Sequence, residues 1–464
     1  MEYGYRSMTI DEAKSTIVKL SGEYPKILIL SRVPFNFNNG TGIALSVLFQ
    51  NWPKNKIAQL YAKGRENIPD RTICNNYYEL GSLELPRVFP LNLYDYVRKK
   101  SFKNTPSDVA VQNPQRLSRP AKYKGLKSRI GKILHEYGWL YPTDCFLSKE
   151  LRVFLDKFSP DLIFSVPAEL AFIRLTSQIS EYLDVPLAVQ VYDNWMPMHY
   201  GRGFSAVKKR QQLEFEFKKL LENASIRFGI CELMCKAYSS KYGKSFYPLP
   251  VSVNTNLWHR PQRKQDKTII SFRIVYAGSI HKHAAFSGLA DMSTVVERLN
   301  KNGIRVDFII LGPQDIDKII KSQLGGQFTK FSTFQEQNEL IDEVSLADLL
   351  FLPVAFDKDS WEFIKYSMPA KSAAYMASGI PMLIYAPKES AISFEARTHG
   401  LAFVVDERNI EMLEAAVKHM LTNEQDRSAF SEAAIAHSRQ HYDRDIVSTR
   451  IHKQLFDAIS FQKK

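Results

Sequence analysis

The chain has 464 residues, a formal net charge of +13 and four cysteines. This length is too great for one hydrophobic core, so we expect two domains, or at most three. Four cysteines are too few for a disulfide framework, and no apolar run reaches the roughly 18–20 residues that span a bilayer. The first residues lack the apolar core of a signal peptide, so we expect a cytoplasmic protein.

The positive charge is concentrated in one segment. Eleven Lys and Arg residues lie between Arg98 and Lys132, against a single acid, Asp108. No aromatic RNA-binding run, zinc-finger spacing or basic helix with heptads accompanies them, so we expect no nucleic-acid partner. Each Lys or Arg near an anionic membrane contributes about 1 kcal/mol, which favours peripheral binding to a membrane surface. The alternative is that this segment is a soluble insertion that binds no membrane.

The first half of the chain alternates short apolar runs with longer amphipathic ones. We expect strands at 26–31, 56–61, 160–165, 185–192 and 225–230. We expect helices at 11–20, from Ile43 onward, at 150–158, 172–183 and 204–222, and up to Tyr242. Such alternation indicates a mainly parallel, doubly wound sheet.

A proline-containing connector at 248–266 is followed by a second alternating unit. We expect strands at 272–277, 305–311, 328–332, 347–352, 382–385 and 401–405. We expect helices at 289–302, 337–344, 370–376, 410–421, 424–442 and 443–459. The resulting domains are 1–250 and 269–440, joined by a linker at 251–268. The final segment, 441–464, is a helix that we expect to pack back on the first domain.

A glycine pair follows the first predicted strand. Gly40-Thr41-Gly42 ends a loop that begins at Asn36, and glycines allow a backbone to approach a ligand closely. It is not a dinucleotide-binding fingerprint, because Leu45 occupies the position of the third glycine.

The stretch 346–384 predicts strand, loop, helix and strand. Ser367 is placed to cap a helix with Pro369 in its first turn. The free N–H groups of the Met368–Lys371 segment would then face the carboxyl end of the preceding strand and favour an anion. A lysine in the first turn opposes the helix dipole, but it suits a bound phosphate. The alternative for Lys371 is a solvated surface lysine.

Four places in the sequence resemble bacterial glycosyltransferases of family 4, which build surface polysaccharides. They are the Gly40–Gly42 loop, the turn 191–195, the strand and loop 275–280, and the run 366–383. The last is similar to the family pattern Pro-x-Lys-x-x-Glu-Tyr-Met-Ala-x-Gly-x-Pro. The resemblance implies the α/β GT-B fold, in which two Rossmann-like domains face each other across a cleft.

The resemblance also implies an activity: transfer of a hexosyl group from a nucleoside-diphosphate sugar to a hydroxyl of a glycan, which we expect to be lipid-linked, with no metal or cofactor. Neutralisation of the leaving diphosphate by helix N–H groups and fixed cations would replace a metal. The donor-binding candidates are Gly40, Thr41, Gly42, Gly278, His281, Lys282, Gly312, Ser367, Met368, Pro369, Ala370, Lys371 and Ser372. His281 and His283 are alternatively surface imidazoles.

On the acceptor side, Asp193 follows a predicted strand and is the candidate to accept the hydroxyl proton. It would alternatively cap its own turn. Trp195 is placed to stack on a sugar or a lipid, or to belong to the core.

The sequence departs from the family at two positions. Many members carry two glutamates where this chain has Tyr366 and Ala374, and the second usually binds the ribose. The departure favours a catalytically inactive GT-B module that binds a partner or a glycan, while the glycine loops and Lys371 favour an active transferase. A GT-B epimerase would need several acids and a histidine around the diphosphate, and the sequence does not supply them together.

Overall fold

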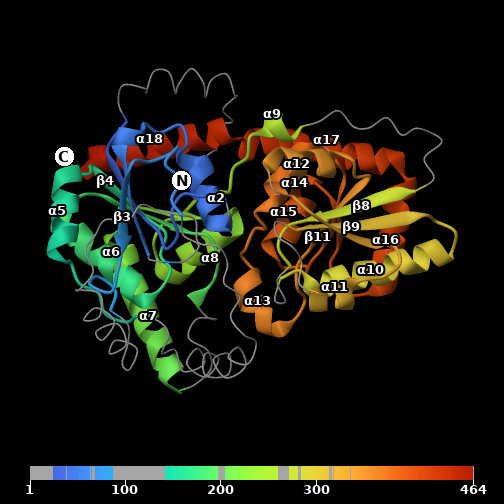
Figure 1. The fold of residues 1–464 in the computed structure, drawn as a ribbon, viewed down its shortest axis with the longest axis horizontal. Coiled ribbons are helices and arrows are strands. Elements are labelled where there is room, and N and C mark those ends of the chain that lie inside the picture. The colour runs from blue at the N-terminus through green and yellow to red at the C-terminus, as the bar shows by residue number, and fades with distance from the viewer. Residues whose placement is uncertain are drawn as a thin grey trace, which may run out of the picture.

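The computed structural model describes residues 24–37, 39–62, 64, 68–86, 142–196, 204–259, 271–280, 284–312, 316, 318–334 and 336–462. These residues form two α/β domains that lie side by side (Figure 1). The predicted helix at 11–20 and the basic segment at 98–132 lie outside the described residues.

The N-terminal domain contains a parallel seven-stranded sheet of order β3-β2-β1-β4-β5-β6-β7. Its strands are β1 (Ile27–Leu30), β2 (Ile57–Ala62), β3 (Asn76–Leu80), β4 (Leu162–Ser165), β5 (Leu187–Val191), β6 (Ile226–Gly229) and β7 (Tyr247–Pro248). The strand order reverses between β1 and β4, where Leu30 pairs with Ser165. This reversal point is where open α/β sheets hold ligands.

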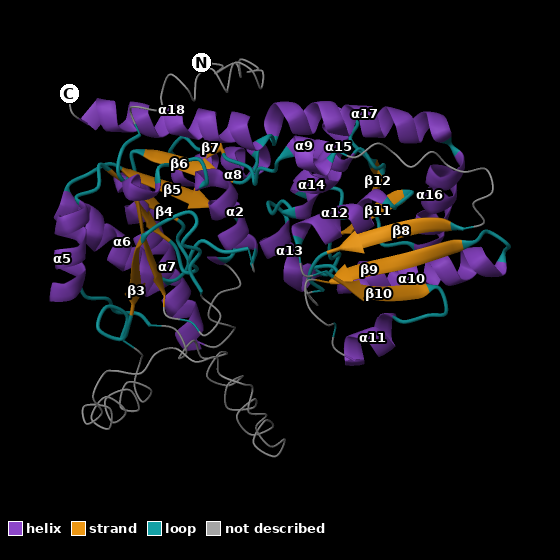
Figure 2. Ribbon diagram, turned by 45° about the horizontal axis from the view of Figure 1, so that its top comes forward, coloured by secondary structure: helices purple, strands orange, loops and turns teal. Residues whose placement is uncertain are grey.

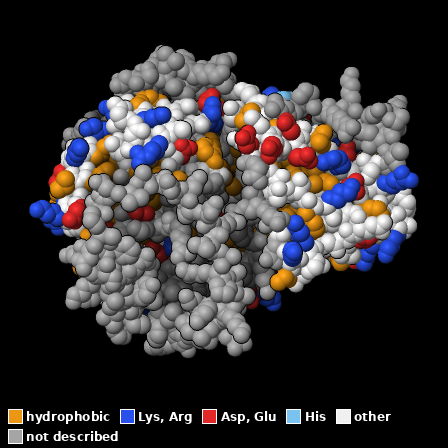
Figure 3. Space-filling view, viewed as in Figure 1, with side chains coloured by type: hydrophobic (Ala, Val, Ile, Leu, Met, Phe, Trp, Pro, Cys, Tyr) orange, Lys and Arg blue, Asp and Glu red, His pale blue; other side chains and the backbone are white. Residues whose placement is uncertain are grey.

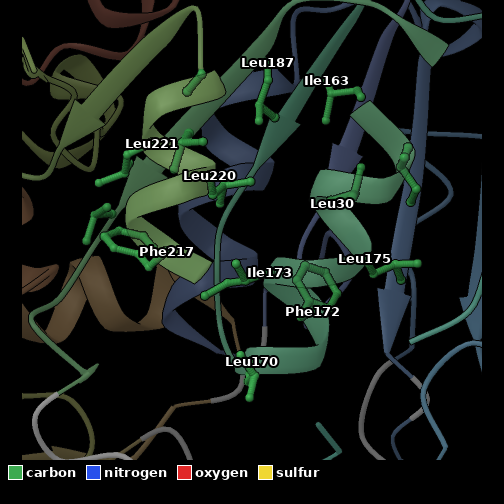
Figure 4. Close-up of a cluster of buried hydrophobic side chains, with 14 of the residues drawn as sticks. Leu30, Ile163, Leu170, Phe172, Ile173, Leu175, Leu187, Phe217, Leu220 and Leu221 are labelled. Carbon is green, nitrogen blue, oxygen red and sulfur yellow. The ribbon is translucent and has the colours of Figure 1, made fainter. Parts of the chain in front are cut away.

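Helices cover both faces of this sheet. Its helical elements are α2 (Gly40–Phe49), the short 3₁₀ helix η1 (Lys54–Lys56), α5 (Lys149–Phe158), α6 (Leu170–Leu183), α7 (Phe204–Asn223) and α8 (Glu232–Tyr242). One face packs against α5 to α8, and Figure 4 shows Phe172 and Ile173 of α6 and Phe217 of α7 gathered there with the strand residue Leu30. The other face packs against α2 and the C-terminal helix α18 (Arg444–Gln462).

The C-terminal domain contains a parallel six-stranded sheet of order β10-β9-β8-β11-β12-β13. Its strands are β8 (Phe272–Ala277), β9 (Val306–Gly312), β10 (Thr329–Thr333), β11 (Leu349–Pro353), β12 (Met382–Tyr385) and β13 (Phe403–Val405). Figure 2 shows β8 and β9 pointing toward the N-terminal domain and β5 pointing back toward the C-terminal one. The carboxyl edges of the two sheets therefore face each other.

Two helical layers enclose this second sheet as well. Its helices are α9 (Thr255–Trp258), α10 (Phe286–Lys301), α11 (Lys318–Leu324), α12 (Gln337–Ser345), α13 (Lys358–Ile364), α14 (Lys371–Ser378), α15 (Ala391–His399), α16 (Ile410–Thr422) and α17 (Glu424–His441). Helices α10, α11 and α16 pack on one face. Helices α12 to α15 pack on the other face, with α17 behind them.

The chain crosses between the domains twice, and the two crossings are bonded to each other. Val253 donates its N–H to the Tyr442 carbonyl at 2.9 Å, and its own carbonyl accepts from Arg444 at 2.8 Å. The buried Asp443 accepts a 2.6 Å hydrogen bond from the Thr255 hydroxyl. After this crossing α18 runs over the N-terminal domain, in line with α17 (Figure 1).

The alternation of elements agrees with the expected sheets, and the departures are local. Helix α2 begins at Gly40, three residues before the predicted start at Ile43, because Asn39 caps it and accepts from the Gly42 N–H at 2.8 Å. Helix α13 occupies the predicted polar loop after β11, with Asp357 as its cap. Patterning did not predict β3, β7, α9 or α15.

Candidate active site

Two of the donor-side candidates, Gly278 and Lys371, meet at the carboxyl edge of the C-terminal sheet. Strand β8 ends at Ala277, and Gly278 follows with a φ of +141°. A Cβ atom on Gly278 would lie 2.6 Å from the Nζ of Lys371. A side chain at Gly278 would displace the lysine, so glycine lets the β8 loop and this lysine meet as they do. Residues 93 positions apart in the chain are thereby brought into contact.

The Lys371 ammonium rests on an aromatic face. Its Nζ lies 3.8 Å from the centre of the Tyr276 ring, an arrangement in which the ring attracts a cation. Burial lowers the pKa of Lys371 to about 7, although the residue as a whole is only partly buried. The lysine is therefore not the solvated surface residue of the alternative interpretation.

A second tyrosine holds the β8 strand end against α14. The Ala277 N–H donates to the Tyr375 hydroxyl at 2.7 Å. Tyr375 is buried and lies one turn after Lys371 on the same helix. This bond fixes the start of α14 relative to the Gly278 loop.

The predicted cap of α14 is wrong. The N-cap is Ala370, whose side chain makes no capping bond. Ser367 instead donates its hydroxyl to the Phe363 carbonyl at 2.8 Å, because it belongs to the turn that ends α13. The N–H of Ser372 is also occupied, donating to the Pro369 carbonyl at 2.8 Å.

The remaining donor-side candidates are spread over two domains. Gly312 is buried at the end of β9, and its carbonyl accepts from Phe334 at 3.3 Å. Met368 packs between the two domain cores. Gly40 and Thr41 lie in the first turn of α2. His281 and Lys282 lie outside the described residues.

Gly42 has a structural explanation of its own. A Cβ atom there would lie 2.4 Å from the Asn36 Oδ1. Gly40, by contrast, faces open space. The packing of Asn36 therefore accounts for Gly42, whereas Gly40 remains a prediction for the donor side.

The acceptor-side candidates follow β5. Burial raises the pKa of the Asp193 carboxyl, and the neighbouring Ser367 hydroxyl lowers it in part. Ser367 belongs to the C-terminal domain, so this carboxyl lies at the contact between the domains. Trp195 packs against the N-terminal core.

Sequence reasoning missed one charged pair at the reversal point of the N-terminal sheet. Arg32 follows β1 and Glu169 follows β4, and their side chains are 3.1 Å apart. Glu169 is buried, with 5% of its side chain exposed, and burial raises its pKa. The Arg32 side chain is half exposed. No motif marks this pair, because it forms only when β1 and β4 become neighbours.

Tyr366 and Ala374 stand at the two positions where many members of the resembled family carry glutamates, and both make apolar contacts. Ala374 is buried in the C-terminal core, and Tyr366 packs against the N-terminal core. The nearby acids are engaged elsewhere, since Asp357 caps α13 and Glu362 pairs with Lys365 at 2.8 Å.

Within the described ranges, His, Cys, Asp and Glu side chains form no group of three or more suited to a metal ion. The four cysteines are buried and free. A search of the same residues finds no helix with the length and apolar character needed to cross a bilayer. Figure 3 shows Lys and Arg side chains interspersed with Asp and Glu over the described part of one face.

Solved structures of glycosyltransferases resemble this chain over most of its length. Sucrose-phosphate synthase from Thermosynechococcus elongatus matches with a TM-score of 0.58 and 13% identity, covering 93% of this chain and 99% of its own. Anabaena HepE, solved with UDP-glucose, matches with a TM-score of 0.56 and 13% identity, covering 93% and 100%. An E. coli structure described as trehalose-6-phosphate bound with UDP-2-fluoro glucose matches with a TM-score of 0.54 and 10% identity, covering 92% and 98%.

No protein-family model matches the chain, and no curated protein matches it. The structural likeness nevertheless confirms the predicted fold class: an α/β protein with two parallel Rossmann-like sheets in the GT-B arrangement. At these identities the likeness establishes the fold alone, and a fold hosts many functions.

Proposed function

We propose that the protein is a metal-independent glycosyltransferase of the hexosyltransferase type that uses a nucleoside-diphosphate sugar as donor. The observation that carries this proposal is Lys371, held against Gly278 and the Tyr276 ring at the start of α14. Burial is the cause of its lowered pKa, and no Asp or Glu of the described residues forms an ion pair with it. A desolvated cation at the carboxyl edge of a parallel sheet is suited to a phosphate group.

The proposed chemistry divides between the two facing edges. The bond between the anomeric carbon and the diphosphate oxygen breaks, and its electron pair leaves with the diphosphate. The anomeric carbon bonds to the acceptor oxygen, whose proton passes to the Asp193 carboxylate. Lys371 and the N–H groups at the start of α14, apart from that of Ser372, stabilise the charge that develops on the diphosphate. Burial raises the pKa of Asp193, which makes its carboxylate a stronger base.

We propose UDP as the nucleotide of the donor. HepE was solved with UDP-glucose, and the E. coli structure carries UDP-2-fluoro glucose. Both share this chain's fold, and we extend the nucleotide to it as part of the proposal.

The proposed acceptor is a lipid-linked glycan of surface polysaccharide synthesis, used at the inner face of the cytoplasmic membrane. Two sequence features support it: the resemblance to polysaccharide-building transferases, and the eleven Lys and Arg residues between Arg98 and Lys132. A cationic segment of this kind attracts anionic lipid headgroups.

A second candidate function is a catalytically inactive GT-B module that binds a glycan or a partner. It is favoured by Ala374 and Tyr366, which stand where many relatives carry glutamates. The two candidates differ in one respect: an active transferase must bind a nucleotide sugar.

A thermal-shift titration against UDP, GDP, CMP and ADP, together with their common sugar conjugates, tests the proposal. A ligand at about 100 times its Kd adds about 2.7 kcal/mol of stability. We expect one nucleoside diphosphate to raise the Tm and its sugar conjugate to raise it further. If no nucleotide shifts the Tm, the transferase proposal fails and the inactive module becomes the better one.

A further inference from the structure

One buried amide joins the two domains beside the candidate base. Asn194 follows Asp193 directly and is 7% exposed. Its Nδ2 donates to the Glu362 carbonyl of the C-terminal domain at 2.5 Å. Its Oδ1 accepts from the Tyr238 hydroxyl of the N-terminal domain at 2.9 Å. The amide thus uses both of its polar atoms to connect helix α13 to the N-terminal sheet.

The end of α13 shows why this amide is needed there. The last carbonyls of a helix lack partners within the helix. The Trp361 carbonyl accepts from the Lys365 N–H, and the Phe363 and Ile364 carbonyls accept from Ser367. These three carbonyls are satisfied within their own domain. The Glu362 carbonyl takes its hydrogen bond from Asn194 in the other domain.

Further contacts fasten the next residues to the same surface. The Cys231 thiol donates to the Tyr366 carbonyl at 3.4 Å, and the rings of Tyr238 and Tyr366 are 6.4 Å apart. The Ser367 hydroxyl lies beside the Asp193 carboxyl, and Met368 packs against the N-terminal core. Segment 362–368 is therefore seated on the N-terminal domain, and it leads directly into Lys371.

We propose that Asn194 is a positioning residue of the transfer reaction, which fixes segment 362–368, and through it Lys371, relative to Asp193. The inference rests on the proposed function. Lys371, Gly278 and Tyr276 belong to one domain and hold the diphosphate without Asn194. The carboxylate that receives the acceptor proton belongs to the other domain. Asn194 sets the distance between these two halves of the reaction.

Asn194→Ala and Asn194→Asp test the proposal. The aspartate has nearly the same shape, but its carboxylate cannot donate to the Glu362 carbonyl and is repelled by it. We expect kcat for transfer to fall by about ten- to a hundredfold in both variants, since small misplacements of reacting groups carry losses of this size. We expect the Kd for UDP to stay within about threefold, because the diphosphate contacts lie in one domain.

Tyr238→Phe is the matched control. It removes the hydroxyl bond to Oδ1 but keeps the ring and the Asn194–Glu362 bond, so we expect kcat within about threefold of wild type. Wild-type kcat in both Asn194 variants overturns the proposal. So does a loss of kcat that only matches the loss of folded, UDP-binding protein, because that indicates a merely structural role.

Small-angle X-ray scattering separates this inference from the proposed function. If the wild type binds no nucleotide, the proposed function fails by that result alone. The scattering of Asn194→Asp then still reports the contact between the domains. A larger radius of gyration than wild type, or a lower Tm with unchanged scattering, supports the contact that Asn194 makes between the domains, and wild-type scattering together with a wild-type Tm overturns it.

Discussion

The two facing sheet edges are built differently. On the proposed donor side, Lys371, Gly278 and Tyr276 meet within one domain and contact each other directly. On the proposed acceptor side, Asp193 lies beside Ser367 of the other domain, and Asn194 donates to the Glu362 carbonyl of that domain. The donor edge is therefore expected to bind its ligand with the domains in any relative position. The acceptor edge is expected to function only when the domains are in contact.

Asp193→Asn is expected to give the largest difference between the two edges, because it changes kcat and not UDP binding. The substitution keeps the shape and removes the base, so we expect kcat for transfer to fall by about 10²–10⁴-fold. UDP should bind with nearly unchanged affinity, which isothermal titration calorimetry checks. An equal loss of UDP affinity would show that the two edges are not separate.

Lys371→Met is expected to weaken UDP binding, which Asp193→Asn leaves nearly unchanged. It removes a charged hydrogen bond to phosphate, which contributes about 1.5–3 kcal/mol, so we expect UDP to bind roughly 10- to 100-fold more weakly. The Tm should not fall, since burial of the ammonium already disfavours it in the folded protein. Lys365→Met is the matched control, because Lys365 pairs with Glu362 and makes no donor-side contact. Unchanged UDP affinity in Lys371→Met would remove Lys371 from the site.

The pH dependence of donor binding also follows from Lys371. Burial lowers the pKa of this amine to about 7 in the free protein, and phosphate binding requires the protonated form. Binding above pH 7 must therefore take up a proton, so the Kd for UDP-glucose should rise with pH. Because one proton is taken up, the Kd can rise by at most about tenfold per pH unit. Affinity is greatest below pH 7.

Titrations between pH 7 and 8 measure this slope, because over that range the diphosphate of UDP-glucose keeps its charge and its uracil N–H stays protonated. Lys371→Arg is the control, since arginine stays charged over this range. A slope in Lys371→Arg as steep as in the wild type would assign the titration to another group.

Gly278→Ala should produce the smallest of these effects. The φ of +141° strains any other residue, at about 1–3 kcal/mol, and the methyl group would displace the Lys371 ammonium. We expect a lower Tm and UDP affinity reduced by about tenfold. Gly303→Ala is the control, because Gly303 has a φ of +83° with open space around it. It should lower the Tm and leave UDP affinity unchanged, and a similar loss of affinity in both variants would point to strain alone.

Local sequence predicted helix α14 and its end at Gly379, because these features lie in one short segment. The run from Pro369 to Pro381 predicts a helix with a lysine near its start and a glycine at its end. Helix α14 lies there, with Gly379 as its C-cap. The prediction that Ser367 caps α14 was wrong. Capping propensity does not show that α13 comes directly before this serine, or that its hydroxyl donates to a carbonyl of that helix.

The sequence by itself determined the alternation of strands and helices, the two parallel sheets, and the lysine at the start of α14. These depend on apolar periodicity and on glycine and proline at fixed offsets, which act over a few residues. Only the tertiary structure decided that Arg32 meets Glu169, that Tyr276 lies under Lys371, and that Asn194 reaches Glu362 across the domains. Such partners are selected by strand order and by domain contact, and no local pattern encodes either.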